Sequence, residues 1–382
     1  MRRRTDSLLR NFSIFKGRAN LRVLYDGSIY SHQVAGGISR YFANIIKNLP
    51  PDFAPILTTK NSRILNYPEH PALKIYNSPV FRPGRIAIPL GKLYFRAVER
   101  IVRPHLIHPT YYSRLTDEKM SHRRCPLVIT VWDMIHEIFS ATMDPHGVGA
   151  REKKEAILGS DAVLCISEST KADLLDRVAV PEERIIVTHL ASEIDDFISH
   201  GDEAVPEQPY FLYVGSRAPY KNFDGLCKAL SILSEKMTDV RLCVVGSPFN
   251  SKENELIGKL GIMKVIENYG EVADSHLAKL YRCSVAFVYP SFYEGFGIPL
   301  LEAMACGTAI IASNCSSIPE VVGDAAMLFE PSDTNSLAEA LFFMLDHPAK
   351  RSDFISKGNE RAKSFSWEKT VAETIQVYRS LL

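Results

Sequence analysis

Short segments rich in Val, Ile and Leu alternate with helical patterns twice along this chain of 382 residues. In the first half the apolar segments are LRVLYDG, PLVITVWD, DAVLCIS and RIIVTHL, and in the second half they are PYFLYVGS, VRLCVVGS, MKVIENYG, SVAFVYPS and GTAIIAS. The four segments of the first half are apolar on both faces, which is typical of parallel strands covered by helices on both sides, and each of the five later strand candidates is followed by a helix-like segment. We therefore predict an α/β protein with two successive doubly wound parallel sheets.

Two helices stand out by their periodicity. Residues 37–49 carry apolar side chains at i, i+3, i+4, i+7, i+8 and i+11, a stripe that packs one helix face onto a sheet. A final helix over residues 366–381 has Trp367, Val371, Ile375 and Tyr378 on one stripe, and we expect it to pack back across the break between the domains.

The alternation pauses at residues 192–209, a stretch with six acidic residues, two prolines and no sustained apolar period. Such a composition is typical of an interdomain linker. The predicted organisation is an N-terminal extension at 1–20, a first Rossmann-like domain at 21–195, a linker at 196–209, a second Rossmann-like domain at 210–365, and a C-terminal helix at 366–382 that crosses back toward the first domain.

Charge and cysteine usage exclude several classes of protein. Lys and Arg total 45 against 44 Asp and Glu, a formal charge of +1, so no general positive field exists to collect nucleic acid. Seven single cysteines without ligand-like spacing favour a reducing, cytoplasmic environment over a disulfide framework or a zinc site. No apolar run is long enough to span a bilayer, and weak peripheral membrane contact through Arg2, Arg3, Arg4 and Phe12 stays open as an alternative.

Polar and glycine residues follow the predicted strands, where ligands bind in doubly wound sheets. Gly36 and Gly37 come just before the helix at 37–49, so free N–H groups there favour an anion or a sugar hydroxyl, although a simple turn is the alternative. The pattern is not GxGxxG, which disfavours a nicotinamide cofactor. Arg217 and Lys221 follow the strand in YFLYVG, before a helix that Asn222 is expected to cap; together the two cations suit a diphosphate, although a solvated basic loop is the alternative.

The most specific pattern is EGFGIPLLE, which follows the strand in SVAFVYPS. Gly295 and Gly297 expose backbone N–H groups at a helix start that Pro299 marks, which suits an anionic leaving group. Glu294 in the loop and Glu302 on the helix would stand on either side of those amides. The segment therefore predicts a site for an anionic ligand.

Glu294 and Glu302 form an E-x7-E pattern, and the chain also contains SRAPYKN, YGEVADSHLAKLY and CGTAIIASNCSSIPEVVGDAAMLFEP. With these motifs the sequence resembles a retaining glycosyltransferase of family four, also called the group 1 glycosyltransferases, across residues 21–382. The resemblance implies the GT-B fold, in which two Rossmann-like domains face a central cleft. It also implies that the second domain holds a nucleotide-sugar and the first holds the acceptor.

The resemblance assigns donor-binding roles residue by residue. It implies that Arg217 and Lys221 grip the donor diphosphate with Ser216 nearby, that the backbone of Val272 meets the base, and that Glu302 binds the ribose hydroxyls. Glu294 is implied to contact hydroxyls of the donor sugar, as a catalytic residue. The backbone amides implied to hold phosphate and sugar are those of Gly295, Phe296, Gly297 and Ile298.

The first domain departs from the family pattern. Many relatives have Val-His-Asp at a strand end, whereas this chain has Val131-Trp132-Asp133, and Trp132 lacks the two polar nitrogens of a histidine. Asp133, which this chain shares with the family pattern, is the second candidate catalytic residue besides Glu294. The candidate acceptor contacts are Gly36, Gly37, His108 and His136.

The implied reaction transfers a hexose with retention of configuration, and we expect no cofactor. No D-x-D pattern occurs in the sequence, so we expect no metal ion; Arg217, Lys221 and a helix N-terminus would stabilise the leaving diphosphate. UDP-glucose or another UDP-hexose is the expected donor, and a saccharide or lipid-linked acceptor in cell-surface polysaccharide biosynthesis is implied by the family. The alternatives are a GDP-mannose-dependent mannosyltransferase and a GT-B protein that binds nucleotide-sugars without catalysis. The expected location is the cytoplasm, with peripheral contact at the inner face of the membrane open; nothing in the sequence predicts the oligomeric state.

Overall fold

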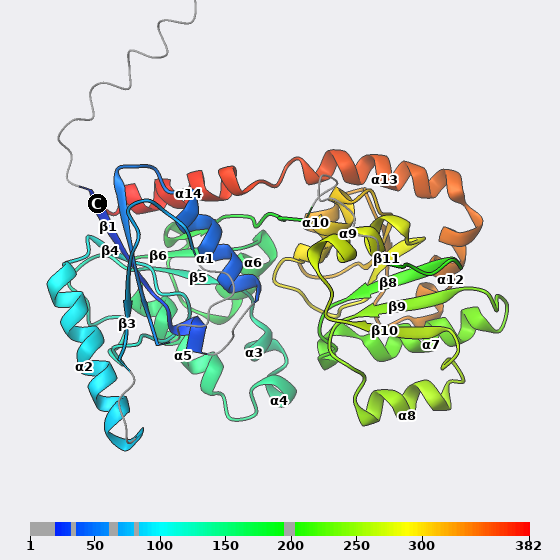
Figure 1. Ribbon diagram of the computed structural model, residues 1–382, viewed down its shortest axis with the longest axis horizontal. Coiled ribbons are helices and arrows are strands. Elements are labelled where there is room, and N and C mark those ends of the chain that lie inside the picture. Colours follow the sequence, from blue (N-terminus) through cyan, green and yellow to red (C-terminus); the bar gives the residue numbers. More distant parts are fainter. Residues whose placement is uncertain (1–19, 32–35, 61–67, 80–83, 195–202) are drawn as a thin grey trace, which may run out of the picture. The chain divides into compact units, whose positions relative to one another are not determined.

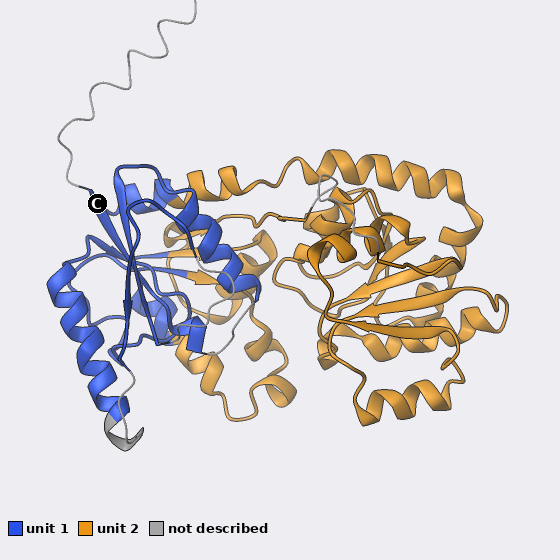
Figure 2. Cartoon of the chain, in the orientation of Figure 1, with its two compact units in different colours: residues 1–129, 155–162, 375–382 blue, residues 130–154, 163–374 orange. Residues whose placement is uncertain are grey.

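The computed structural model describes residues 20–31, 36–60, 68–79, 84–194 and 203–382 (Figure 1). The N-terminal extension, including Arg2, Arg3, Arg4 and Phe12, therefore lies outside the described residues except for its last residue, as does the first half of the predicted linker, residues 196–202. The chain divides into two compact units (Figure 2). Unit 1 comprises residues 1–129, 155–162 and 375–382, and unit 2 comprises residues 130–154 and 163–374. The domain boundaries expected from the sequence stay a prediction.

Unit 1 contains a parallel sheet with the strand order β3-β2-β1-β4. Its elements are β1 (Leu21–Asp26), α1 (Gly37–Lys47), β2 (Phe53–Thr59), β3 (Lys74–Asn77), α2 (Gly84–Val102) and β4 (Leu106–Ile107), with a short 3-10 helix at Ser28–Ser31. The stripe expected on the first helix is confirmed, because Tyr41, Phe42, Ile45 and Ile46 are fully buried. Strands β2 and β3 were not expected from the sequence.

A second parallel sheet has the order β5-β6-β7 and contains three strands that the sequence predicted. Its elements are β5 (Val128–Val131), α3 (Ile135–Ile138), α4 (Ser140–Met143), α5 (Val148–Gly159), β6 (Ala162–Cys165), α6 (Glu168–Arg177) and β7 (Ile185–Val187), with a 3-10 turn at Glu182–Arg184. Ser167 caps α6 by accepting a hydrogen bond of 2.9 Å from the N–H of Thr170.

The largest sheet lies in unit 2 and has six parallel strands in the order β10-β9-β8-β11-β12-β13. Its strands are β8 (Tyr210–Val214), β9 (Arg241–Val245), β10 (Ile266–Gly270), β11 (Ala286–Tyr289), β12 (Ile310–Ser313) and β13 (Met327–Phe329). The helices are α7 (Phe223–Ser234), α8 (Ser251–Lys259), α9 (Asp274–Cys283), α10 (Ile298–Ala305), α11 (Ile318–Val322), α12 (Thr334–Asp346) and α13 (Pro348–Ala362), with a 3-10 turn at Pro219–Lys221. The order reverses between β8 and β11, and ligands of doubly wound sheets bind at the carboxyl ends of the strands at such a switch point.

The last helix, α14 (Trp367–Ser380), begins in unit 2 and ends in unit 1. Within unit 1 the hydroxyl of Tyr378 lies 2.6 Å from Nδ1 of His108 and 3.3 Å from the hydroxyl of Tyr25. All three side chains are fully buried, and burial lowers the pKa of His108 to about 3. His108 is therefore a neutral ring at ordinary pH, and its polar contact is with the end of α14.

Candidate functional site

Two loops meet at the switch point of the large sheet. One follows β8 and carries Lys221, and the other follows β11 and carries Glu294; the N–H of Phe292 donates to the carbonyl of Tyr220 at 2.7 Å and joins the loops. Nζ of Lys221 then lies 2.7 Å and 2.8 Å from the two carboxylate oxygens of Glu294. The structure thus brings together two residues that the sequence assigned to the donor.

The carboxylate of Glu294 is deeply set and held from several sides. The residue is 6% exposed, Oε1 accepts a 2.6 Å bond from Ser291, and its backbone N–H donates to Oγ of Ser316 at 2.9 Å. Burial, followed by the negative charge and the hydrogen bond of Glu294, raises the pKa of Tyr289 well above its ordinary value. A neutral tyrosine and a lysine therefore flank this carboxylate.

Gly295 lies so close to another segment of unit 2 that no larger residue fits. A Cβ placed on Gly295 would be 1.9 Å from the carbonyl oxygen of Trp132 and 3.1 Å from Cβ of Asp133. The carbonyl of Gly295 accepts hydrogen bonds of 2.7 Å from Ser167 and 3.1 Å from Thr170. The glycine therefore sets a backbone-to-backbone contact between the loop after β11 and the segment that carries Asp133.

The amides of the next residues lead into helix α10. Gly297 is the N-cap with φ of 108°, a conformation that favours glycine, and Pro299 follows in the first turn as expected. The hydroxyl of Ser317 lies within hydrogen-bond distance of two backbone carbonyls nearby. Its Oγ is 2.9 Å from the backbone oxygen of Glu294 and 3.0 Å from that of Phe296. Phe296 is buried, and Ile298 is the first residue of α10.

Arg217 is committed to a different set of partners from Lys221. Nε lies 2.8 Å from Oε1 of Glu253, and Nη2 donates to the carbonyls of Ser247 and Pro248 at 2.8 Å each. The guanidinium also lies over the ring of Phe249. Its remaining nitrogen, Nη1, is buried and has no hydrogen-bond partner among the described residues.

Asn222 is the N-cap residue of α7, but its side chain makes no hydrogen bond to the helix, so the predicted capping bond is wrong. Its backbone is left-handed with φ of 53°, and its side-chain amide donates to the carbonyl of Pro331 at 2.9 Å instead of accepting from the helix. The amide nitrogen of Asn222 therefore ties this loop to the segment after β13, and its side-chain oxygen makes no capping bond to α7.

The other predicted donor contacts lie on neighbouring elements of the same sheet. Glu302 is buried on α10, where Oε2 accepts a 3.0 Å bond from the hydroxyl of Tyr281. Ser216 is exposed after β8 and its carbonyl accepts from Tyr213 at 2.7 Å, and Val272 is half-buried between β10 and α9.

Asp133 is held by a buried lysine that sequence reasoning missed. Nζ of Lys153 donates to the carbonyl of Asp133 at 2.9 Å, lies 3.5 Å from its Oδ1, and pairs with Glu137 at 2.8 Å. Oδ1 of Asp133 also accepts from the N–H of Ile135, which starts α3. His136 is half-buried on α3, with Nδ1 unpaired among the described residues.

The remaining acceptor candidates belong to unit 1. Gly36 is the N-cap of α1 and Gly37 its first residue, and Ser39 closes that turn by bonding both the N–H and the carbonyl of Gly36. His108 is buried and bonded to Tyr378, so it offers no accessible atom to a ligand in this structure. These three residues lie in unit 1, whereas Lys221 and Glu294 lie in unit 2.

Glu253 is a site residue that was not predicted from the sequence, although its position three residues after Asn250 indicates a helix start. Asn250 and Glu253 form a capping box at the start of α8, with bonds of 3.0 Å and 2.8 Å between each side chain and the other's backbone N–H. The spacing of Asn and Glu predicts that box. It does not predict that Glu253 also binds Arg217.

Comparison with known families accounts for both halves of the chain. Residues 195–361 match the family described as glycosyl transferases group 1, and residues 35–192 match the family described as glycosyltransferase family 4. The chain therefore belongs to the group 1 glycosyltransferases.

Two curated relatives in that class are mannosyltransferases. O-antigen chain mannosyltransferase B of Escherichia coli is 33% identical over 239 residues, which cover 59% of this chain and 62% of that protein. MMP alpha-(1->4)-mannosyltransferase of Mycolicibacterium hassiacum is 31% identical over 225 residues, which cover 58% of this chain and 54% of that protein. The match therefore spans less than two thirds of either relative.

Solved structures confirm the GT-B fold that the sequence predicted. HepE of Anabaena in complex with UDP and glucose matches with a TM-score of 0.72 at 17% identity, covering 94% of this chain and 100% of that one. A sucrose-phosphate synthase from Thermosynechococcus elongatus matches with a TM-score of 0.71 at 21% identity, covering 94% and 98%.

Proposed function

We propose that this protein is a glycosyltransferase that moves a hexose from a nucleotide-sugar to a saccharide or lipid-linked acceptor in cell-surface polysaccharide biosynthesis. The observation that carries the proposal is the contact of Lys221 with Glu294, formed by the loops after β8 and β11 at the switch point of the large sheet. Membership of the group 1 glycosyltransferases and the names of the relatives support the reaction class.

Two donors follow from different observations. UDP-glucose or another UDP-hexose is the donor expected from the sequence. The two relatives described above are both named as mannosyltransferases, which favours mannose, whereas another relative at 31% identity is named as a D-inositol 3-phosphate glycosyltransferase. GDP-mannose is then the second candidate donor. We therefore propose a hexosyltransferase, with mannose as the sugar that the comparisons favour.

Lys221 and the loop after β11 form the proposed core of the donor site. Lys221 neutralises the diphosphate, Glu294 accepts hydrogen bonds from hydroxyls of the donor sugar, and the amides of Gly295 to Ile298 hold phosphate and sugar. Arg217 is the second proposed diphosphate ligand, through the unpaired Nη1, with Ser216 beside it.

The nucleoside is proposed to lie against the elements next to that core. The backbone of Val272, between β10 and α9, would meet the base. Glu302, on α10, would bind the ribose hydroxyls.

The proposed reaction retains the configuration of the sugar and uses no metal ion. The bond between the anomeric carbon and the diphosphate oxygen breaks while the acceptor oxygen bonds to the same face, and a leaving phosphate oxygen takes the acceptor proton. Lys221 and the N-terminus of α10 stabilise the charge that develops on the diphosphate. Asp133, whose Cβ lies beside Gly295, is proposed to position the acceptor, for which Gly36, Gly37 and His136 are further candidates.

The proposed working place is the cytoplasmic side of a membrane. In the described part of the chain, no helix is both long and apolar enough to cross a bilayer. Peripheral contact would bring the protein to a lipid-linked acceptor, and nucleic acid is not a proposed partner.

A panel of nucleotide-sugars tests this proposal. Melting of the full chain is followed with UDP-, GDP-, ADP- and dTDP-sugars, because a ligand that binds the folded state raises the melting temperature. The proposal requires a rise with one sugar nucleotide and slow release of free sugar from it. Binding without release, with every acceptor tried, would favour the inactive GT-B alternative instead.

A further inference from the structure

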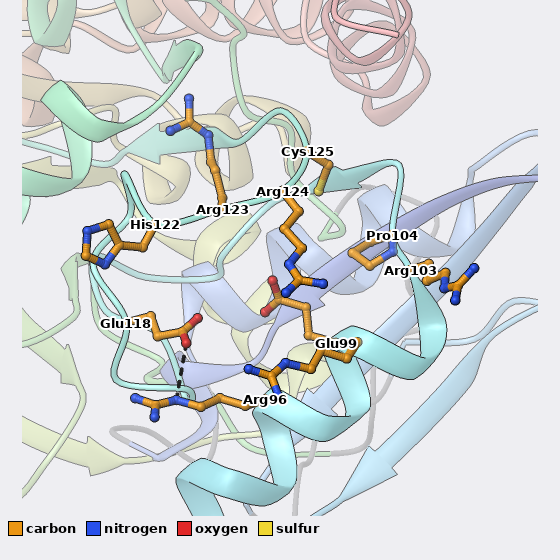
Figure 3. A pocket seen from close by; sticks show the side chains of 10 residues that line it. Arg96, Glu99, Arg103, Pro104, Glu118, His122, Arg123, Arg124 and Cys125 are labelled. Atoms are coloured by element: carbon orange, nitrogen blue, oxygen red, sulfur yellow. Dashed lines mark ion pairs between the residues drawn. The ribbon is translucent and has the colours of Figure 1, made fainter.

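Unit 1 contains a second concave site, with a volume of about 760 Å³ (Figure 3). It lies between the last turns of α2 and the segment at residues 118–125, just before β4 and β5 begin. It is therefore at the amino ends of these strands, whereas ligands of doubly wound sheets bind at the carboxyl ends. The volume is that of an ordinary small-molecule site.

Arginine dominates the lining of this pocket. The arginines are Arg96, Arg100, Arg103, Arg123 and Arg124. Two carboxylates share the lining, but both already have cationic partners: Glu99 pairs with the buried Arg114, and Glu118 lies 3.3 Å from Arg96. Burial raises the pKa of the neighbouring Cys125 to about 11, so its thiol adds no negative charge at neutral pH.

Three of the arginines form a surplus of positive charge. Arg123 pairs with Asp161, whereas no carboxylate of the described residues lies within ion-pair distance of Arg100, Arg103 or Arg124, and all three are exposed. The helix dipole favours cations at the end of α2, which accounts for Arg100 and Arg103. It does not account for Arg124, which a separate segment brings to the same pocket (Figure 3).

We propose that this pocket binds a phosphate group, at a site separate from the proposed donor site. Guanidinium groups match phosphate oxygens through paired N–H donors, and three unpaired arginines around one concave surface provide them. Because the chain as a whole has a net charge of only +1, the surplus of positive charge in this pocket is local and not part of a general positive field.

The phosphate group has two possible sources. One is a soluble phosphate compound, and the other is the headgroup of an anionic phospholipid. The second source gains support from α2, which leaves Leu93 and Ile101 more than half exposed near the arginines at its end, as an interfacial helix does.

The test compares two charge-matched double variants of the full chain. Arg100→Gln with Arg124→Gln removes two pocket charges, and Arg151→Gln with Lys350→Gln removes two exposed charges elsewhere. In one arm, inorganic pyrophosphate is titrated in a Lys221→Met background, so that binding at the proposed donor site is weakened equally in both variants. In the other arm, the variants are sedimented with vesicles of phosphatidylcholine, alone or mixed with phosphatidylglycerol.

We expect the pocket variant to weaken binding of at least one probe by roughly tenfold or more, with the control variant close to the parent. Loss in the pyrophosphate arm alone identifies a soluble ligand, loss with phosphatidylglycerol vesicles alone identifies a lipid headgroup, and loss in both arms supports the shared chemistry. If neither arm separates the pocket variant from its control, the proposal is overturned. Binding in these arms does not depend on glycosyl transfer, so failure here leaves the proposed function standing.

Discussion

Lys221 and Glu294 are 73 residues apart in the chain, yet Nζ of Lys221 lies within 2.8 Å of both carboxylate oxygens of Glu294. Their side chains are 17% and 8% exposed, so each charge depends on the other for compensation. An incoming diphosphate would compete with Glu294 for this lysine. Glu294 would then be free to accept hydrogen bonds from the sugar, which couples binding of the two halves of the donor.

Lys221→Ala is expected to lower turnover by roughly ten- to a hundredfold, because a hydrogen bond to a charged group contributes about 1.5 to 3 kcal/mol. Steady-state kinetics with the donor identified by the melting panel measure this loss. Turnover within about threefold of the parent would remove Lys221 from the site.

Glu294→Gln keeps the size of the side chain but loses its charge and one acceptor. We expect it to impair sugar transfer more than binding of the free nucleoside diphosphate, which lacks the sugar. Calorimetric titration with the diphosphate, alongside kinetics, separates the two. An equal loss of both would mean that Glu294 contacts the diphosphate part of the donor.

Arg217→Lys tests whether Arg217, whose guanidinium is hydrogen-bonded to Glu253 and to two backbone carbonyls, also binds the donor diphosphate. Lysine keeps the charge but cannot reproduce the bonds to Glu253, Ser247 and Pro248, so we expect a loss of about 2 to 3 kcal/mol in the free energy of unfolding. If Arg217 also binds the diphosphate, Arg217→Lys is expected to lower turnover by roughly tenfold. Glu253→Gln is the control, since it weakens the same pair from the other side. Parental turnover in both variants would leave Arg217 a purely structural residue.

The strands and the switch point could be predicted from the sequence, but several partners could not. Most of the nine predicted strands are apolar runs that the sheets bury, whereas β10 carries Glu267 and Asn268 and is only partly buried. Among the strands that were not predicted, β13 has three residues, too short for a period, and β2 contains Pro55. The meeting of Lys221 with Glu294 follows from parallel topology, because both residues come after strands whose carboxyl ends share one edge.

Contacts between helices and loops could not be predicted from apolar runs or from parallel topology. Lys153 is fully buried on α5 beside Asp133, although a lysine in a charged helix is normally expected in solvent. Asn222 has the residue type of a helix cap, but a left-handed backbone turns its side chain toward Pro331. In both cases tertiary packing overrides a local preference.

Gly295→Ala is expected to destabilise the protein by at least about 3 kcal/mol, because the new Cβ would overlap the carbonyl of Trp132. Gly258→Ala is the matched control. Gly258 lies in the exposed face of α8 with no atom within 4 Å of the added carbon, so alanine there should stabilise the protein by about 0.5 to 1 kcal/mol. Urea unfolding of both variants measures the difference. Two variants of equal stability would show that the loop and the Trp132 segment separate at little cost.

Asp26, at the end of β1, should make stability depend on pH. It is 2% exposed, its carboxylate accepts from the N–H of Leu115, and burial raises its pKa from 3.8 to about 7. Because the folded state holds the proton more tightly than the unfolded state, the stabilisation is complete below pH 3.8 and is lost as the pH rises through about 7.

Asp26→Asn cannot ionise and keeps an acceptor for Leu115, so it isolates this effect. Between about pH 5 and about pH 8 the parent should lose about 2 to 3 kcal/mol of unfolding free energy relative to Asp26→Asn. Urea unfolding at the two pH values measures the difference, and Asp239→Asn, at an exposed position, should follow the parent. Parallel pH profiles for the parent and Asp26→Asn would mean that Asp26 stays ionised in the folded protein, with Arg114 compensating its burial.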